Sequence, residues 1–334
     1  MTTRSRGPSH CLRCVLGLLA LIPFAASAAN SQAPDVPFEL HLVAAHAPYA
    51  AQELILGAWQ EGGKVVAVGE HGVVLLSQDG GAHFEQAAEV PTSAALNDVS
   101  FVGRQGWAVG QWRVILHSSD GGEHWTMQYS NPRNDRPLFG VYFLDREQGF
   151  AVGLWSLLMS TRDGGRTWQQ VKLREPKGLR VSGPSLYHMF AAPDGTLFIT
   201  AERGYVLRST DRGATWSVID TGYHGSLWSG CAGSSGRIWV GGLRGTILFS
   251  DDDGLSWRHA HSGTLDSITD LVCSPRGVLA ASVGGDLLRG TEQGDAFAPL
   301  QARDHRAYTA LTLDQARVRP YGVGGVLPRV ALGR

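Results

Sequence analysis

Aspartates recur at a nearly constant spacing and are the first candidates for chemistry in this sequence. The pattern Ser/Thr-x-Asp-x-Gly-x-x-aromatic, which we name the Asp box, occurs five times, with its carboxylates at Asp79, Asp120, Asp163, Asp211 and Asp252. Carboxylates can act as general acids or bind calcium. An aspartate before a glycine can also accept backbone N–H bonds within its own turn. Because turns on separate hairpins cannot form one active site, we interpret all five aspartates as structural.

A run of three acids, Asp251–Asp253, also suggests calcium, which prefers several carboxylate oxygens. The same run fits an Asp box with acidic neighbours, and we favour that interpretation. The 12 histidines are scattered, and no pair has metal-ligand spacing with a third ligand. The glycine pairs end hairpins rather than open helices, so they predict no phosphate loop. The sequence therefore predicts neither a metal site nor a cofactor.

The residues best suited to binding lie in short turns that precede the Asp boxes. Exposed tryptophan and arginine side chains dominate the binding energy of protein interfaces. We predict that these turns bind a protein or peptide partner through His71, Trp112, Arg113, Trp155, Arg203 and Arg244. The alternative is that they are ordinary solvated turn residues.

A basic loop is the second candidate for binding. The segment 171–185 contains Lys172, Arg174, Lys177 and Arg180, against the single acid Glu175. Long loops on rigid scaffolds often carry function. This loop could meet an acidic protein surface or lipid headgroups, and the alternative is a solvated insertion.

The spacing of the Asp boxes predicts the fold that positions these turns. A sixth, degenerate copy reads Gly290, Glu292, Gly294 and Phe297. The second glycines of the six copies are separated by 41, 43, 48, 41 and 40 residues, a length that suits one four-stranded blade. In the second repeat, alternation and glycine turns predict strands at 96–102, 106–110 and 114–118, and a fourth after Trp125.

The two ends of the chain supply a seventh blade. After Gly294, strand patterns near 307–313, 317–323 and 325–331 give three strands. An alternating segment at about 36–43 precedes the first repeat, and we expect it to pair as the missing fourth strand. This pairing would close the ring and leave no open sheet edge. The predicted fold is therefore all-β, a seven-bladed β-propeller that spans residues 29–334 as one domain.

The first 28 residues have the pattern of a signal peptide. Arg4, Arg6 and Arg13 precede the apolar stretch Val15–Phe24, and Ala26-Ser27-Ala28 fits cleavage near Ala28. The apolar stretch is shorter than the roughly 20 residues of a membrane span, and an uncleaved anchor is the alternative. We predict a periplasmic or secreted monomer with no transmembrane segment in its mature chain.

The net charge argues against a nucleic-acid partner. The full chain has 29 basic and 30 acidic residues. Cleavage after Ala28 would remove three arginines and no acid, which leaves 26 against 30 and a net charge of −4. Binding to nucleic acid rests on phosphate neutralisation by an excess of cations, which this chain lacks.

Two cysteines remain after residue 28. Cys231 and Cys273 are 42 residues apart, about one repeat, so they should occupy similar places on the first strands of adjacent blades. We expect those strands to diverge, whereas a disulfide needs Cα atoms within about 7 Å. The sequence thus favours two buried free thiols, and a disulfide is the alternative.

Whole repeats carry a family resemblance. One repeat reads Leu96-Asn-Asp-Val-Ser-Phe, then Gly106-Trp-Ala-Val-Gly110, then Ser118-Ser-Asp-Gly-Gly122 with Trp125. The next combines Leu138-Phe-Gly-Val-Tyr-Phe-Leu-Asp145 with Gly149-Phe-Ala-Val-Gly153, Gly165 and Trp168. These motifs resemble the photosystem II stability and assembly factor family of seven-bladed propellers.

The resemblance implies a noncatalytic scaffold or assembly factor of the cell envelope. Such factors bind partly assembled membrane-protein subunits in oxygenic phototrophs. Relatives in other bacteria suggest a link to envelope transport systems. A sialidase-like or other glycan-active propeller is the alternative. It would need an arginine triad, a tyrosine nucleophile and a Phe/Tyr-Arg-Ile-Pro tetrapeptide near its start, and the tetrapeptide is absent.

Overall fold

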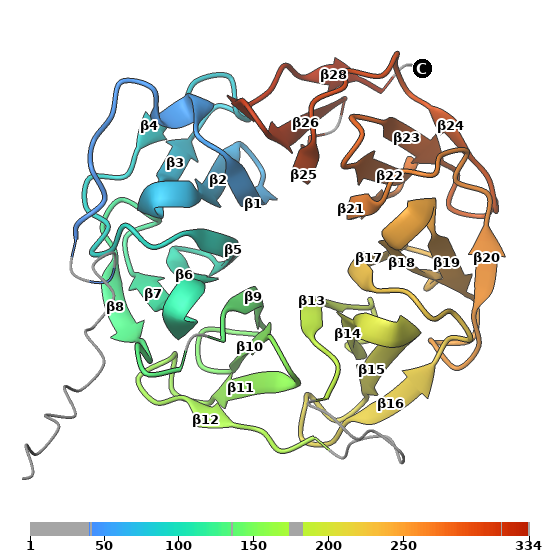
Figure 1. The fold of residues 1–334 in the computed structure, drawn as a ribbon, viewed down its shortest axis with the longest axis horizontal. Coiled ribbons are helices and arrows are strands. Elements are labelled where there is room, and N and C mark those ends of the chain that lie inside the picture. The colour runs from blue at the N-terminus through green and yellow to red at the C-terminus, as the bar shows by residue number, and fades with distance from the viewer. Residues whose placement is uncertain (1–39, 41, 135, 174–182, 315, 333–334) are drawn as a thin grey trace, which may run out of the picture. The chain divides into compact units, whose positions relative to one another are not determined.

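The chain forms seven four-stranded antiparallel sheets arranged in a ring, as predicted (Figure 1). The computed structural model describes residues 40, 42–134, 136–173, 183–314 and 316–332, all within the compact unit Val36–Arg334. Each sheet is one blade, and its strands follow one another from the centre of the ring outward. The fold is a seven-bladed β-propeller.

The strands of the seven blades follow the predicted repeats. Blade 1 contains β1 Ile55–Glu61, β2 Lys64–Gly69, β3 Val74–Ser77 and β4 Glu85–Gln86, and blade 2 contains β5 Leu96–Val102, β6 Gln105–Gly110, β7 Ile115–Ser118 and β8 Thr126–Tyr129. Blade 3 contains β9 Leu138–Phe143, β10 Gly149–Gly153, β11 Leu157–Thr161 and β12 Gln169–Gln170, and blade 4 contains β13 Leu186–Ala191, β14 Leu197–Ala201, β15 Tyr205–Ser209 and β16 Ser217–Asp220. Blade 5 contains β17 Leu227–Ala232, β18 Ile238–Gly242, β19 Ile247–Ser250 and β20 Arg258–Ala260, and blade 6 contains β21 Ile268–Ser274, β22 Gly277–Ser282, β23 Leu287–Gly290 and β24 Phe297–Pro299. Blade 7 contains β25 Tyr308–Leu313, β26 Arg317–Gly322, β27 Gly325–Val326 and β28 Val330–Ala331.

Short 3-10 turns complete the elements. The turn η2 Ala50–Gln52 precedes β1. Four others join the second and third strands of their blades: η3 Glu70–Gly72, η4 Gln111–Arg113, η5 Glu202–Gly204 and η6 Leu243–Gly245.

The hydrophobic core lies between neighbouring blades. Strands β10, β14, β18 and β22 are buried at every residue, because both faces of each sheet are covered by the next sheets. One cluster joins Trp107 of blade 2 to Leu138, Val141 and Phe143 of blade 3. The aromatic residue of each Asp box packs into the same layer, and Trp168 meets Phe143 edge-on at 5.9 Å between ring centroids.

The Asp-box carboxylates are saturated by their own turns. Asp252 accepts hydrogen bonds from Ser250 Oγ at 2.7 Å, from Ser256 N at 2.8 Å and from Ser256 Oγ at 2.5 Å. The hydroxyl of Ser250 accepts the N–H of Gly254 at 2.8 Å. These bonds, first that of the Ser256 hydroxyl, lower the pKa of Asp252 to about 2. Both oxygens of this carboxylate thus accept hydrogen bonds within the turn.

Blade 7 differs from its prediction. The segment 325–331, expected as one strand, is divided by Pro328, whose nitrogen cannot donate to a ladder. It forms β27 and β28, which both pair with β26. The predicted closing strand at about 36–43 falls mostly outside the described residues. Leu40, which is described, is buried with side chains of blades 1 and 2.

The two cysteines form a disulfide, so the prediction of free thiols was wrong. Cys231 of β17 and Cys273 of β21 are bonded, and their Cα atoms are 5.6 Å apart. The first strands do not diverge here, because Ser229 Oγ donates to Asp270 Oδ1 at 2.8 Å and holds the two strands together at the ring centre. Both cysteines are half-buried rather than buried.

Removal of this disulfide should destabilise the ring. We expect the double substitution Cys231→Ser and Cys273→Ser to lower the free energy of unfolding by about 2–4 kcal/mol, because the cross-link restricts the unfolded chain. Urea unfolding measures the change. Alkylation in denaturant without reductant should leave both cysteine-containing peptides unmodified by mass spectrometry, and their full alkylation would contradict the bond.

Candidate binding face

All seven turns between second and third strands lie at the same end of the ring as the starts of the first strands. The first residue of the turn donates its N–H to the carbonyl just before the first strand of its own blade. Glu70 N meets Leu54 O at 3.0 Å, and Leu243 N meets Ser226 O at 3.0 Å. The same bond recurs in the other five blades. We name this end the binding face, and the Asp boxes occupy the opposite end.

The predicted binding residues occupy one recurring position on this face. In five blades the second turn residue has a left-handed backbone with φ between 55° and 61°, namely His71, Trp112, Trp155, Arg203 and Arg244. Large side chains rarely adopt this conformation, and it persists only where the surrounding structure enforces it. Strain of this kind, repeated at one end of a ring, is a reason to examine that end for function.

Charges on the binding face are unevenly paired. In blades 6 and 7, Arg303 contacts Asp266 and Asp286, and Arg306 contacts Asp304. In blades 4 and 5, Arg203 and Arg244 are exposed, and neither has an ion-pair partner among the described residues. Blades 4 and 5 therefore present cations that are free to meet an acidic partner.

The two predicted tryptophans have different environments. Trp155 is 48% exposed. Trp112 is partly buried and packs against the core cluster of blades 1 and 2. Of the two, Trp155 is the side chain available to a partner.

A pocket of about 460 Å³ opens beside Trp155. We name it the basic pocket, and its lining comprises Arg136, Trp155, Ser156, Gln170, Val171, Lys172, Leu173 and Gly183. Lys172 is exposed and belongs to the predicted basic loop. The other loop cations, Arg174, Lys177 and Arg180, lie outside the described residues.

Arg113 ends the turn η4 of blade 2, and Arg136 lines the pocket beside Trp155. Arg113 is 5% exposed, and its Nε and Nη2 atoms have no hydrogen-bond partner. Burial, and then the positive charge of Arg113, lowers the pKa of Arg136. Sequence reasoning found Arg113 but missed Arg136, which lies between two blades in the loop 130–137. The charged composition of that loop was the only available signal.

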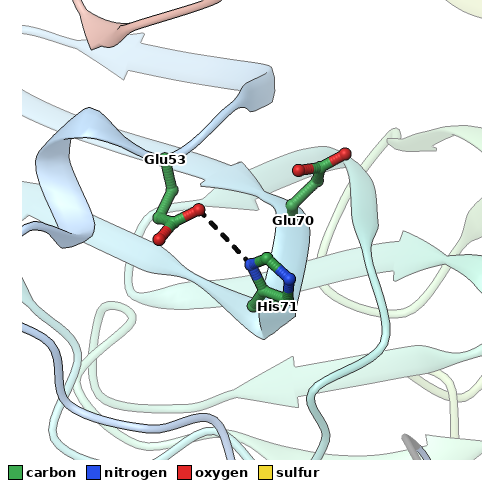
Figure 2. Close-up of side chains that lie close together, drawn as sticks. All are labelled: Glu53, Glu70 and His71. Atoms are coloured by element: carbon green, nitrogen blue, oxygen red, sulfur yellow. Dashed lines mark hydrogen bonds and ion pairs between the residues drawn. The ribbon is translucent and has the colours of Figure 1, made fainter.

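His71 belongs to a separate cluster on blade 1. Its Nδ1 lies 3.3 Å from Glu53 Oε2, and Glu70 lies close by (Figure 2). One imidazole and two carboxylates within 4.8 Å could hold a divalent cation. The His71 side chain is 71% exposed, and exposed acidic groups are common without a metal. We therefore treat the cluster as an ion pair of the turn.

Buried ionisable groups line the centre of the ring. Asp98 Oδ2 accepts the N–H of Val141 at 2.9 Å, and Asp270 Oδ2 accepts that of Leu311 at 2.8 Å. Burial raises the pKa of Asp98 to about 7 and that of Asp270 to about 6. Burial also lowers the pKa of His188 to about 4. Since each carboxylate binds the backbone of the next blade, these groups connect blades.

Tyr187, which borders the central cavity, is paired with Glu202. Tyr187 Oη donates to Glu202 Oε1 at 3.3 Å. Burial raises the pKa of Tyr187, which is the opposite of what an activated nucleophile requires. Among the described residues, no arginine lines the central cavity that Tyr187 borders. A sialidase site needs a group of arginines there, so this geometry does not favour glycoside hydrolysis.

Comparisons with known proteins agree with this architecture. The family model described as "Photosynthesis system II assembly factor YCF48" matches residues 58–135 and 128–224, which together span half of the chain. The solved structure "YCF48 bound to D1 peptide" is 21% identical, with a TM-score of 0.68 and coverage of 84% of this chain and 94% of the other. YCF48 from Cyanidioschyzon merolae is 19% identical, with a TM-score of 0.66 and coverage of 84% and 96%.

A catalytic propeller is also similar in fold. Virginiamycin B lyase from Staphylococcus aureus is 12% identical, with a TM-score of 0.68 and coverage of 84% of this chain and 96% of the other. No curated protein matched the sequence. At these identities the structural similarities report the fold alone.

The raised pKa of Asp98 gives a stability prediction with a definite sign. A carboxyl group whose pKa rises from 3.8 to about 7 on folding stabilises the fold most below pH 4, and this contribution disappears as the pH rises toward 7. Asp98→Asn mimics the protonated group at every pH. Relative to this variant, the native protein should lose on the order of 2–4 kcal/mol of unfolding free energy between pH 4 and pH 7.

Urea unfolding at several pH values measures this difference. Asp252→Asn is the matched control, because the pKa of Asp252 is lowered and its contribution should instead disappear as the pH falls from about 4 to about 2. Parallel curves for the native protein and Asp98→Asn would show that Asp98 does not titrate in this range.

Proposed function

The chain belongs to the photosynthesis system II assembly factor YCF48 family, and on this premise we propose that it is a noncatalytic scaffold whose binding face holds a segment of a partner protein. The observation that carries the proposal is the row of left-handed turns with large side chains. Rigid backbone positions that present tryptophan and arginine reduce the entropy lost on binding.

Charge supports the same proposal. On the binding face, Arg203 and Arg244 of blades 4 and 5 have no ion-pair partner among the described residues, whereas Arg303 and Arg306 of blades 6 and 7 are paired. A partner segment with acidic residues would complement these cations and would be steered toward them. A related propeller, "YCF48 bound to D1 peptide", shows that a peptide can be held by a ring of this type.

A second function, catalysis by a glycan-active or lyase-like propeller, has less support. The buried carboxylates at the centre bind backbone N–H groups, and the tyrosine there has a raised pKa. No observation on the described residues assigns a nucleophile with a base beside it.

The proposed location is the periplasm or the cell exterior. The Cys231–Cys273 disulfide supports it, because such bonds persist mainly in oxidising compartments. The signal-peptide pattern of residues 1–28 supports it as well. No helix among the described residues is long and apolar enough to cross a membrane.

The partner we propose is a membrane-protein subunit, of a photosystem or of an envelope transport system. Affinity purification of the tagged protein from its native envelope, followed by mass spectrometry, identifies it. The double substitution Trp155→Ala and Arg203→Ala should reduce partner recovery at least tenfold, since each residue is exposed on the binding face.

The control variant carries a matched change at the opposite end of the ring. Leu255→Ala and Arg162→Ala remove one exposed apolar side chain and one exposed arginine from Asp-box turns. Both double variants should unfold like the native protein, and only the first should lose its partner. Equal recovery from the two variants would contradict binding at this face.

A further inference from the structure

We propose that the cavity at the centre of the ring binds an alkylammonium group, between three aromatic side chains of blades 3 to 5 and the carboxylates of Asp98 and Asp270. This cavity is separate from the exposed arginines of the binding face, and the inference goes beyond the proposed protein-binding function. Neither the family match nor the similar structures assign a ligand to it.

A bulge at the second residue of each first strand builds the cavity. In all seven blades the pairing with the second strand shifts across this residue, as between Leu96 and Asp98 in blade 2 and between Leu227 and Ser229 in blade 5. Successive side chains of a regular strand point to opposite faces, but a bulge re-aims one of them. The second and third residues of the first strand therefore both line the cavity in every blade except blade 3, which contributes only its second residue.

Three neighbouring blades place an aromatic residue at this bulge, namely Phe139, Tyr187 and Trp228. All three side chains are half-buried, so they remain within reach of a ligand in the cavity. The rings of Phe139 and Tyr187 are stacked, with their centroids 5.6 Å apart and an angle of 28° between their planes. Aromatic rings grouped in this way attract a cation to their negative faces, and such groups recognise ammonium ligands.

Two carboxyl groups lie in the same cavity without a cation beside them. Neither Asp98 nor Asp270 forms an ion pair with a described residue, and no described lysine or arginine lines the cavity. An ionised carboxylate has about four acceptor sites. Asp98 uses two of them, for the N–H groups of Val99 and Val141. Its other sites can accept the N–H donors of an ammonium group.

The other titratable groups at the cavity do not oppose a cation. Burial lowers the pKa of His188 to about 4, so its imidazole is neutral near pH 7, and Nδ1 accepts the N–H of Gly230 at 3.3 Å. Burial raises the pKa of Tyr187, whose hydroxyl donates to Glu202 at 3.3 Å. The residues that blades 1, 3, 5 and 7 contribute to the lining carry no charge.

The size of the cavity limits the ligand. Its volume is about 130 Å³, which has room for a small organic cation or for the end of one long side chain. The ammonium group of a free amine and that of a lysine side chain share the required chemistry, a positive charge with N–H donors on an apolar chain.

Direct titration tests the site without knowledge of a partner. The probe is n-butylammonium chloride, and n-butanol is the neutral ligand of similar size. Isothermal titration calorimetry at pH 8 should give n-butylammonium a Kd lower by about tenfold or more. Equal affinity for the two ligands would overturn the proposal. Potassium chloride that binds as tightly as n-butylammonium would also overturn it, since an inorganic cation needs no aromatic wall.

The affinity for n-butylammonium should rise with pH. Burial, with a smaller contribution from Asp270, raises the pKa of Asp98 to about 7, and burial raises that of Asp270 to about 6. A cation binds the ionised carboxylates, whereas the amine itself stays protonated up to about pH 10. The affinity should therefore fall by about tenfold or more from pH 8 to pH 5.5.

Asp98→Asn tests the assigned carboxylate. The variant keeps an acceptor for Val141 but removes the charge, so at pH 8 it should bind n-butylammonium about tenfold more weakly and should lose most of the pH dependence. Asp252→Asn is the matched control, because it removes an acid at the opposite end of the ring, and it should change the Kd less than about twofold. Unchanged affinity in a folded Asp98→Asn variant would overturn the assignment.

Trp228→Leu tests the aromatic wall. Leucine keeps an apolar side chain but removes the ring, so the ratio of the n-butylammonium and n-butanol affinities should fall about two- to fivefold. An unchanged ratio would contradict the aromatic assignment. The native protein provides a test that needs no variant. Titration at pH 7 in two buffers of different ionisation enthalpy should show that part of a proton leaves the protein for each ammonium bound, and no release would contradict the role of Asp98.

A last arm identifies the source of the ammonium group. Acetyl-lysine-amide that binds more tightly than n-butylammonium would assign the site to a lysine side chain, and the reverse order would assign it to a free amine. Absence of binding by both would overturn the proposal. Because these titrations use no partner protein, their failure is distinct from a failure of the partner-recovery experiment with the Trp155→Ala and Arg203→Ala variant.

Discussion

The ring depends on how the innermost strands bind one another, because each first strand contacts the first strand of the next blade. The third residue of each first strand sets this contact. Asp98, His188, Ser229 and Asp270 each accept a backbone N–H from the next blade. At other junctions the strands approach so closely that a Cβ on Gly57 would lie 2.6 Å from Asn97 O. Hydrogen-bond acceptors thus occupy this position in blades 2, 4, 5 and 6, and glycines occupy it in blades 1 and 3, where less space is available.

The two ends of the ring then serve different purposes. At one end, Asp-box carbonyls accept bonds from the preceding blade, as when Trp107 Nε1 donates to Gly164 O at 3.1 Å and Arg237 Nη1 donates to Gly294 O at 2.7 Å. The degenerate box also accepts a side-chain bond from the preceding blade, since Glu292 accepts the N–H of Ser235 in blade 5 at 2.9 Å. These contacts between blades constrain the sequence of the Asp-box turns. On the binding face, no side-chain hydrogen bond of this kind recurs from blade to blade among the described residues. Its turns are therefore free to differ from blade to blade.

This division explains which features the sequence could predict. A repeated local turn leaves a repeated motif, so the spacing of the Asp boxes predicted six blades and located the turns that carry Trp155 and Arg203, and strand patterns near the ends of the chain added the seventh blade. The disulfide was missed because it depends on the distance between two first strands, which the Ser229–Asp270 bond determines and no motif records. Arg136 was missed for a similar reason, because only the path of the loop between blades 2 and 3 brings it to the pocket beside Trp155.

The third residue of the turn between the second and third strands is glycine in blades 1, 4 and 5, but it is Arg113 in blade 2 and Ser156 in blade 3. This difference is the strongest sign that the binding face has been adapted. Glycine there accommodates a close carbonyl and a left-handed backbone at little energetic cost. Blades 2 and 3 instead place Arg113 and Ser156 in the left-handed region, at φ of 55° each. Arg113 adds the desolvation of a charge to that strain. Neither the backbone strain nor the desolvation improves the packing of the ring, because other blades form the same turn with a glycine.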